Sequence, residues 1–244
     1  KNSIVMRVNI HLSLWALVTL MFATAMNAQD VQSLIDEMNV RHIGPGAMSG
    51  RVTTIDVQRD RPEVIYIGTA SGGLWRSESA GVEWEALFDD QPTQSIGALA
   101  ISSSNPDVIW AGTGEGNPRN SHSSGRGVYR SIDGGNSWTL MGLEGTKNIH
   151  KIIIHPEDHR TVWVGAIGTA WGDNPERGVY KTTDGGETWT HQLSVDERTG
   201  VADMIIDPSN PDKLWVAMWS HRREPWFFTS GGEGSGLYVT YNGG

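Results

Sequence analysis

Apolar and polar positions follow the same order four times along the chain. Four stretches align without gaps, namely residues 55–66, 99–110, 152–163 and 204–215. Each stretch is an apolar run, a polar segment that contains proline and a second apolar run that ends in Tyr or Trp. A third run follows in every copy, at residues 73–76, 127–130, 178–181 and 236–239. Short apolar runs separated by turn residues predict antiparallel strands, and a fourth strand such as residues 85–88 completes the unit.

In two copies the third run leads into the pattern S/T-x-D-x-G-x-S/T-W. Its defined positions are Ser131, Asp133, Gly135 and Trp138 in one copy, and Thr182, Asp184, Gly186 and Trp189 in the other. This is the chemistry of a tight hairpin, in which Asp accepts backbone N–H groups, glycine adopts a positive φ and Trp anchors the turn. We expect these eight residues to be structural. The copy at 77–84 has Ser79 in place of Asp.

The two Asp residues of this pattern lie 51 positions apart, and repeats of about 40–50 residues with several strands each are typical of propeller blades. We predict an all-β fold, a β-propeller of four-stranded blades at about 51–90, 95–143, 148–194 and 200–244. Because the last copy ends inside its hairpin and a propeller closes into a ring, we expect a fragment of about three and a half blades.

The N-terminal residues have the pattern of an export signal. Arg7 precedes an apolar stretch at 10–22 and small residues at 23–28, so we predict a signal peptide at 1–28 and a lead-in segment at 29–50. The alternative is a membrane anchor, but the apolar stretch is shorter than the roughly 20 residues that a span needs. We therefore expect a periplasmic, cell-surface or secreted protein that does not span the membrane after the signal is removed.

Composition narrows the possible partners. The net charge is −9, and removal of residues 1–28 takes away two bases and no acid, so the expected surface repels nucleic acid and anionic membranes. The absence of cysteine excludes disulfides and thiolate metal sites, and an exported protein of this kind suits a bacterial envelope. His155 and His159 have metal-like spacing but align with turn positions, so we predict no metal and no cofactor.

With these hairpins the chain resembles the BNR or Asp-box repeat superfamily, and in particular large exported bacterial proteins described as sortilin (VPS10)-like or glycosyl-hydrolase-like. Residues 41–45 and 50–52 resemble the opening of their first blade, and residues 69–75, 112–115 and 235–238 resemble their blade signatures. Families with this hairpin include sialidases, xyloglucan-cleaving endoglucanases, sortilin-type peptide receptors and photosystem assembly factors. The resemblance implies that the hairpins face away from the ligand, and it does not determine the activity.

The connection between the second and third strands varies between copies. It is short at residues 70–72 and long at 114–126, 168–177 and 220–234. Insertions on one face of a repeat protein usually mark its binding face, although ordinary solvated loops are the alternative. Trp can stack on sugars or apolar groups and Arg can hold carboxylates. The candidate binding residues are Arg119, His122, Arg126, Trp171, Arg177, His221, Arg222, Arg223 and Trp226.

Three functions remain open. The leading hypothesis is a non-catalytic module that binds a protein, peptide or glycan through these loops. The alternative is a glycoside hydrolase, and the third is an assembly scaffold. A sialidase needs a tyrosine nucleophile, and the repeat accounts for all five tyrosines. A xyloglucanase-like hydrolase needs only two carboxylates, for which the candidates are Glu115, Asp173, Glu176 and Glu224.

Overall fold

The computed structural model describes residues 51–244, and the structural statements below concern these residues. The predicted signal peptide and lead-in segment lie outside them. The described chain forms four antiparallel sheets and one short 3-10 turn, η1 (Glu144–Thr146). No helix in residues 51–244 is long and apolar enough to cross a membrane.

The first three sheets follow the chain from one strand to the next, whereas in the fourth sheet β16 pairs with β14 and β15 pairs only with the extension of β14. The first two contain β1 (Val52–Val57), β2 (Ile65–Thr69), β3 (Leu74–Ser77) and β4 (Glu85–Ala86), then β5 (Ile96–Ile101), β6 (Ile109–Thr113), β7 (Val128–Ser131) and β8 (Thr139–Leu140). The other two contain β9 (Ile149–Ile154), β10 (Val162–Ala166), β11 (Gly178–Thr182) and β12 (Thr190–Leu193), then β13 (Thr199–Asp207), β14 (Asn210–Glu224), β15 (Phe227–Ser230) and β16 (Gly236–Thr240). The strands alternate with tight turns and loops, as the sequence pattern predicts.

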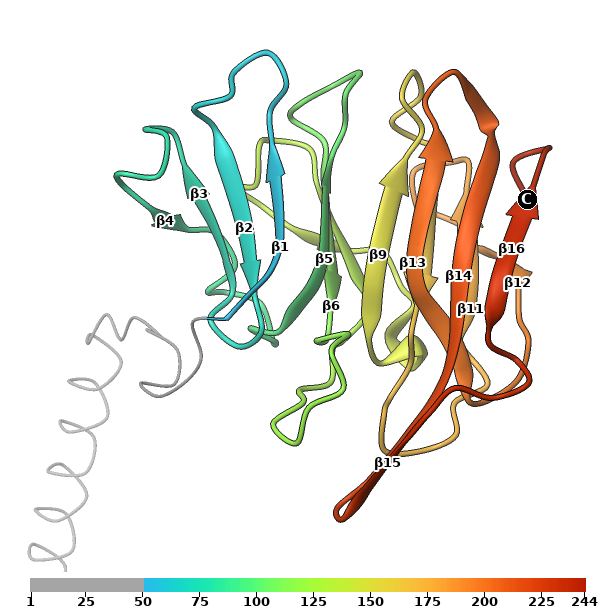
Figure 1. Ribbon diagram of the computed structural model, residues 1–244. Helices are drawn as coiled ribbons and strands as arrows, with labels where there is room; N and C mark the ends of the chain where they lie inside the picture. The colour runs from blue at the N-terminus through green and yellow to red at the C-terminus, as the bar shows by residue number, and fades with distance from the viewer. Residues whose placement is uncertain (1–50) are drawn as a thin grey trace, which may run out of the picture. The chain divides into compact units, whose positions relative to one another are not determined.

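The sheets pack face to face as propeller blades do. Their first strands β1, β5, β9 and β13 lie next to one another in chain order (Figure 1). A separate apolar cluster fills each of the three spaces between neighbouring sheets. The central strands read as continuous apolar runs because both faces of a blade are buried. The prediction of a β-propeller built from four-stranded blades is confirmed.

The two octapeptide hairpins are held by the predicted side chains. The Ser131 hydroxyl accepts from Gly135 N at 2.8 Å, and the Asp133 carboxylate accepts from Ser137 N at 2.9 Å. In the next blade Thr182 and Asp184 make the equivalent bonds to Gly186 N at 2.9 Å and Thr188 N at 3.0 Å. The degenerate hairpin keeps this geometry because the Ser79 hydroxyl accepts from Glu83 N at 2.8 Å.

The hairpins of the second, third and fourth blades also dock on the preceding blade. Gly134 O accepts from the Tyr66 hydroxyl and from Arg76 Nη1, both at 3.0 Å. Gly243 O accepts in the same way from Trp163 Nε1 at 3.0 Å and Lys181 Nζ at 2.7 Å. We call this pair of contacts, an aromatic residue of the second strand and a cation of the third, the inter-blade clamp.

The clamp between the second and third blades uses packing in place of the aromatic hydrogen bond. Arg130 donates to Gly185 O, and the rings of Trp110 and Trp189 meet edge to face at 5.9 Å. Gly186 has φ +95°, and a Cβ at this position would lie 2.7 Å from the Trp110 ring. Only glycine therefore fits the hairpin against the ring.

The long insertion of the fourth blade is more regular than predicted. The sequence predicts a loop at 220–234, whereas β14 continues to Glu224 and pairs with β15 in a hairpin. The extension carries aromatic residues and Thr, which favour strands. It projects from the end of the blades opposite the hairpins (Figure 1).

The first prediction concerns acid unfolding. Hydrogen bonds from Thr188 and Thr182 lower the pKa of Asp184, so its carboxylate stabilises the folded state above the unfolded-state pKa of about 4, and this contribution is lost as the pH falls further. Asp184→Asn should lower the Tm at pH 7, and the difference from wild type should shrink below about pH 4. Thermal unfolding followed by circular dichroism measures this. The exposed Asp90→Asn serves as the control, and equal effects of both variants would contradict the prediction.

Candidate functional site

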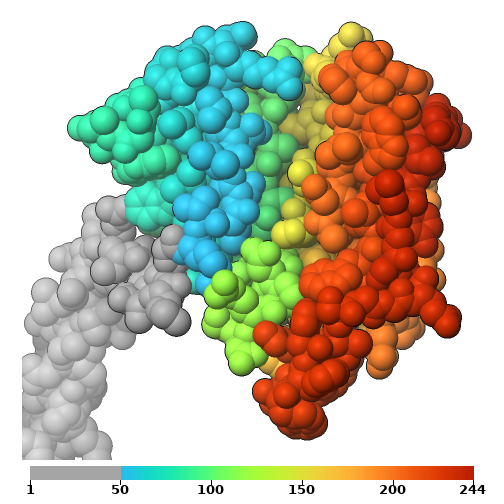
Figure 2. Space-filling model, viewed as in Figure 1, coloured from blue at the N-terminus to red at the C-terminus, as the bar shows by residue number. Residues whose placement is uncertain are grey.

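The three long connections converge at the end of the blades opposite the hairpins. Figure 2 shows residues 114–126 beside the β14–β15 extension at this end. Arg223 N donates to Ala170 O at 2.7 Å, which joins the extension to the loop at 168–177. The charge of Arg223 also acts on the ring of His122 in the second blade. We call this surface the loop face.

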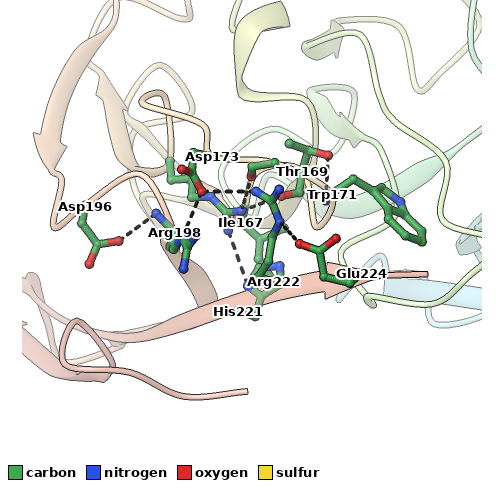
Figure 3. Close-up of polar contacts among 11 residues, drawn as sticks. Ile167, Thr169, Trp171, Asp173, Asp196, Arg198, His221, Arg222 and Glu224 are labelled. Atoms are coloured by element: carbon green, nitrogen blue, oxygen red, sulfur yellow. Dashed lines mark hydrogen bonds and ion pairs between the residues drawn. The ribbon is translucent and has the colours of Figure 1, made fainter. Parts of the chain in front are cut away.

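An ion-pair network lies across the two later loops. Asp173 Oδ1 accepts from Arg198 Nε at 3.0 Å and from Arg222 Nη1 at 3.2 Å. Arg222 Nε donates to Glu224 Oε1 at 3.2 Å, so one guanidinium holds two carboxylates (Figure 3). The two carboxylates are therefore neighbours on the loop face, on either side of the Arg222 guanidinium.

Arg177 lies beneath this network and shapes the loop. Its side chain is fully buried, and its guanidinium donates to Ile167 O at 2.6 Å, to Thr169 O, and to Gly172 O at 3.3 Å. Burial lowers the pKa of Arg177 to about 10. The sequence predicts Arg177 on the binding face, whereas the carbonyls of its own loop hold the guanidinium inside the protein.

His221 is also buried instead of exposed. Its ring stacks on Trp219 at 4.6 Å, and its Nδ1 lies 3.4 Å from Arg177 Nη1. Burial and the nearby Arg177 charge lower the pKa of His221 to about 4. The prediction that His221 presents its ring on the binding face is corrected, because this residue of β14 is buried against Trp219 and Arg177.

Glu115 is enclosed in the second blade. It is 0% exposed, and Arg51 donates to its carboxylate Oε1 from Nε at 3.0 Å and also from Nη2. The Asn148 amide donates to Glu115 O at 2.8 Å and to Ser123 O at 2.9 Å. This arrangement links three blades. Because the carboxylate is covered, Glu115 does not present an oxygen at the surface to a polymer.

The other candidates are placed at or near the surface. His122 is half-buried 3.5 Å from the Asn148 amide, and burial lowers its pKa. Arg223 is half-buried with its guanidinium 5.0 Å from the Phe228 ring. The exposed candidates are Arg119, Arg126, Trp171, Glu176 and Trp226.

Sequence reasoning missed Arg51, Asn148 and Arg198, which hold the predicted carboxylates and loops. None carries a local motif, because each acts on a residue at least 25 positions away. Within residues 51–244 no group of three His, Asp or Glu side chains is arranged to hold a metal ion. His155 instead accepts from Glu157 N and Asp158 N at 3.2 Å, as a turn residue does.

Four-stranded blades with their long loops at one end define a segment of a β-propeller. Comparison with known proteins shows which propeller proteins the chain is similar to. No family model matches the chain. A xyloglucanase of Paenibacillus sp. is 25% identical over 184 residues, which cover 70% of this chain and 17% of that enzyme. Xyloglucanase Xgh74A of Acetivibrio thermocellus is 26% identical over 210 residues, which cover 70% of this chain and 23% of that enzyme. The chain therefore spans less than a quarter of the length of these curated relatives.

Solved structures show the same fold. An ancestral GH74 enzyme matches with a TM-score of 0.58 at 21% identity, over 80% of this chain and 25% of that chain. The GH74 xyloglucanase from Xanthomonas campestris matches with a TM-score of 0.56 at 17% identity, over 80% of this chain and 29% of that chain. These likenesses establish a β-propeller fold. The sortilin-like and Asp-box affiliations remain predictions.

The second prediction concerns His221. Because its folded pKa of about 4 is below the unfolded value of about 6.5, the unfolded chain binds the proton first and stability falls as the pH drops from about 6.5 to 4. The loss due to this residue is up to about 3 kcal/mol. An NMR titration of the imidazoles should show a neutral His221 ring at pH 5, and unfolding of His221→Gln should depend less on pH in this range. A titration midpoint near 6.5, or an equal effect of the control His159→Gln, would contradict the assignment.

Proposed function

We propose that this chain is part of an exported glycoside-hydrolase-type β-propeller that binds a xyloglucan-like β-glucan on its loop face. The single observation that carries the proposal is the carboxylate pair Asp173 and Glu224, held by Arg222 between two loops that each expose a tryptophan. The similarity to xyloglucanases supports a glycan over a protein or peptide ligand. We therefore prefer the alternative from the sequence, a glycoside hydrolase, to the leading hypothesis of a non-catalytic binding module.

The tryptophans supply the apolar contact that a sugar ring needs. Trp171 is 38% exposed and Trp226 is 82% exposed, with the exposed Phe227 beside it. An exposed indole loses little conformational entropy when it binds, and it offers a flat apolar face to the C–H groups of a pyranose. The Arg223–Ala170 hydrogen bond joins the two loops that carry these tryptophans.

The carboxylates and arginines supply the polar contacts. Asp173 and Glu224 can accept from sugar hydroxyls, and Arg198 and Arg222 can donate to ring or glycosidic oxygens. Two neighbouring carboxylates are also the groups that general acid and base catalysis of glycoside cleavage uses. Glu176 is exposed on the same loop, whereas Glu115 is held as a structural link between blades.

The third prediction tests binding. Trp171→Ala and Trp226→Ala should each weaken the affinity of the full chain for xyloglucan heptasaccharide by about 5–10-fold, because an exposed stacking platform is lost. Isothermal titration calorimetry measures the change. Trp84→Ala is the matched control, since Trp84 is 39% exposed but lies in the hairpin of the first blade, on the opposite face.

Hydrolysis is the second readout of the same experiment. If the carboxylate pair is catalytic, Asp173→Asn should abolish release of reducing ends from xyloglucan and leave binding within a few-fold. If wild type binds no β-glucan, or if Trp84→Ala weakens binding as much as the loop-face variants, the proposal is wrong.

A further inference from the structure

A cavity beside the second blade lies apart from the Asp173–Glu224 pair. Its volume is about 640 Å³, and its lining combines two cations, one carboxylate, one phenol and an apolar floor, contributed by Arg126, Lys147, Glu144, Tyr129, Leu140 and Pro92. The chain as a whole has a net charge of −9, whereas the charged side chains that line this pocket have a net charge of +1. We call it the Tyr129 cavity.

Tyr129 differs from its counterparts in the later blades. The same third-strand position holds Tyr180, whose hydroxyl donates to Glu176 O at 3.1 Å, and Tyr238, whose hydroxyl lies 3.5 Å from Gly234 O. Both acceptors lie four residues before the tyrosine. The equivalent residue for Tyr129 is Gly125, and within residues 51–244 neither its carbonyl nor any other group accepts from the Tyr129 hydroxyl.

The ring of Tyr129 is buried, whereas its hydroxyl is open to the cavity. Tyr129 is 2% exposed, and its ring packs edge to face on Phe88 at 5.2 Å. Burial raises the pKa of Tyr129, and the charges of Arg126 and Glu144 both act on the hydroxyl. The group is therefore a protonated donor at the wall of the cavity, where its oxygen is open to solvent and can donate to water or to a ligand.

The two cations are presented by fixed backbone. Arg126 N donates to the buried Thr113 hydroxyl at 2.7 Å, and Gly125 N donates to Lys147 O at 2.6 Å. Lys147 has φ +64° and ψ −56°, and Asn148 N donates to Thr146 O at 2.7 Å, which together form a γ-turn of the rare, strained kind. Strain of this kind persists where surrounding contacts enforce it, often beside a ligand site.

Arg126 also contrasts with its counterpart in the third blade. Both Arg126 and Arg177 immediately precede the glycine that opens the third strand. Arg177 is buried and donates to its own loop, whereas Arg126 is exposed and lines the cavity. In the second blade both the arginine and the tyrosine are thus free of the loop contacts that occupy them in the third.

We propose that the Tyr129 cavity is a second subsite that binds a carboxylate-bearing sugar, a uronic acid unit. Arg126 and Lys147 attract the carboxylate, the Tyr129 hydroxyl donates to it, Glu144 accepts from a sugar hydroxyl, and Leu140 contacts the apolar face of the ring. The choice of a sugar rests on the proposed function, whereas the preference for a carboxylate rests on the cavity alone.

The fourth prediction uses trigalacturonic acid and its methyl ester as probes of the full chain. The acid should bind at least about 10-fold more tightly than the ester, because the ester lacks the charge. Tyr129→Phe keeps the ring against Phe88 and should weaken binding of the acid about 5–10-fold. Arg126→Gln should abolish the preference for the acid. Calorimetry or ligand-observed NMR measures these affinities.

Tyr180→Phe is the matched control, since it removes the same hydroxyl from a residue whose partner is its own loop, and it should leave the affinity unchanged. Equal affinity for acid and ester, or wild-type affinity in a Tyr129→Phe protein with unaltered Tm, would overturn the subsite. Xyloglucan heptasaccharide binding should be unaffected by Tyr129→Phe. If the wild-type protein binds trigalacturonic acid but not xyloglucan heptasaccharide, the proposed function is wrong and the uronate subsite is still supported.

Discussion

The inter-blade clamp is the contact on which the rest of the structure depends. In each of the first three blades an aromatic residue and a cation contact the hairpin of the next blade, at Gly134, Gly185–Gly186 and Gly243. Together with contacts such as the 2.8 Å hydrogen bond from Ile101 N to Asp56 Oδ2, the clamp sets the angle between neighbouring blades. That angle brings the long loops together at the opposite end, where Asp173, Arg222 and Glu224 meet.

The parts of the fold that depend on nearby residues could be predicted from the sequence. The hairpin pattern makes its hydrogen bonds within five residues, as those of Asp133 and Asp184 do. The strands could be predicted because each blade repeats one order of apolar runs. Comparing the copies also identified the loops that vary, and these loops form the loop face.

What the sequence could not predict is which way individual side chains turn. Arg126 and Arg177 occupy one position of the repeat, yet only Arg177 is drawn into its loop by backbone carbonyls. Tyr129 and Tyr180 differ in the same way. Glu115 is a catalytic candidate by sequence, but its carboxylate is bound by Arg51, which lies 64 positions away in the chain. Such contacts depend on loop conformation and long-range packing, for which no local pattern exists.

The proposed glycan sites, the loop face and the Tyr129 cavity, lie away from the hairpins that hold the blades together. Hydrogen–deuterium exchange with and without xyloglucan heptasaccharide tests this division most directly, because it reports every backbone amide in one experiment. The account predicts slower exchange at residues 168–177 and 220–234 and no change at the hairpins 131–138 and 182–189. Protection confined to the hairpins, or no protection at saturating ligand, would contradict it.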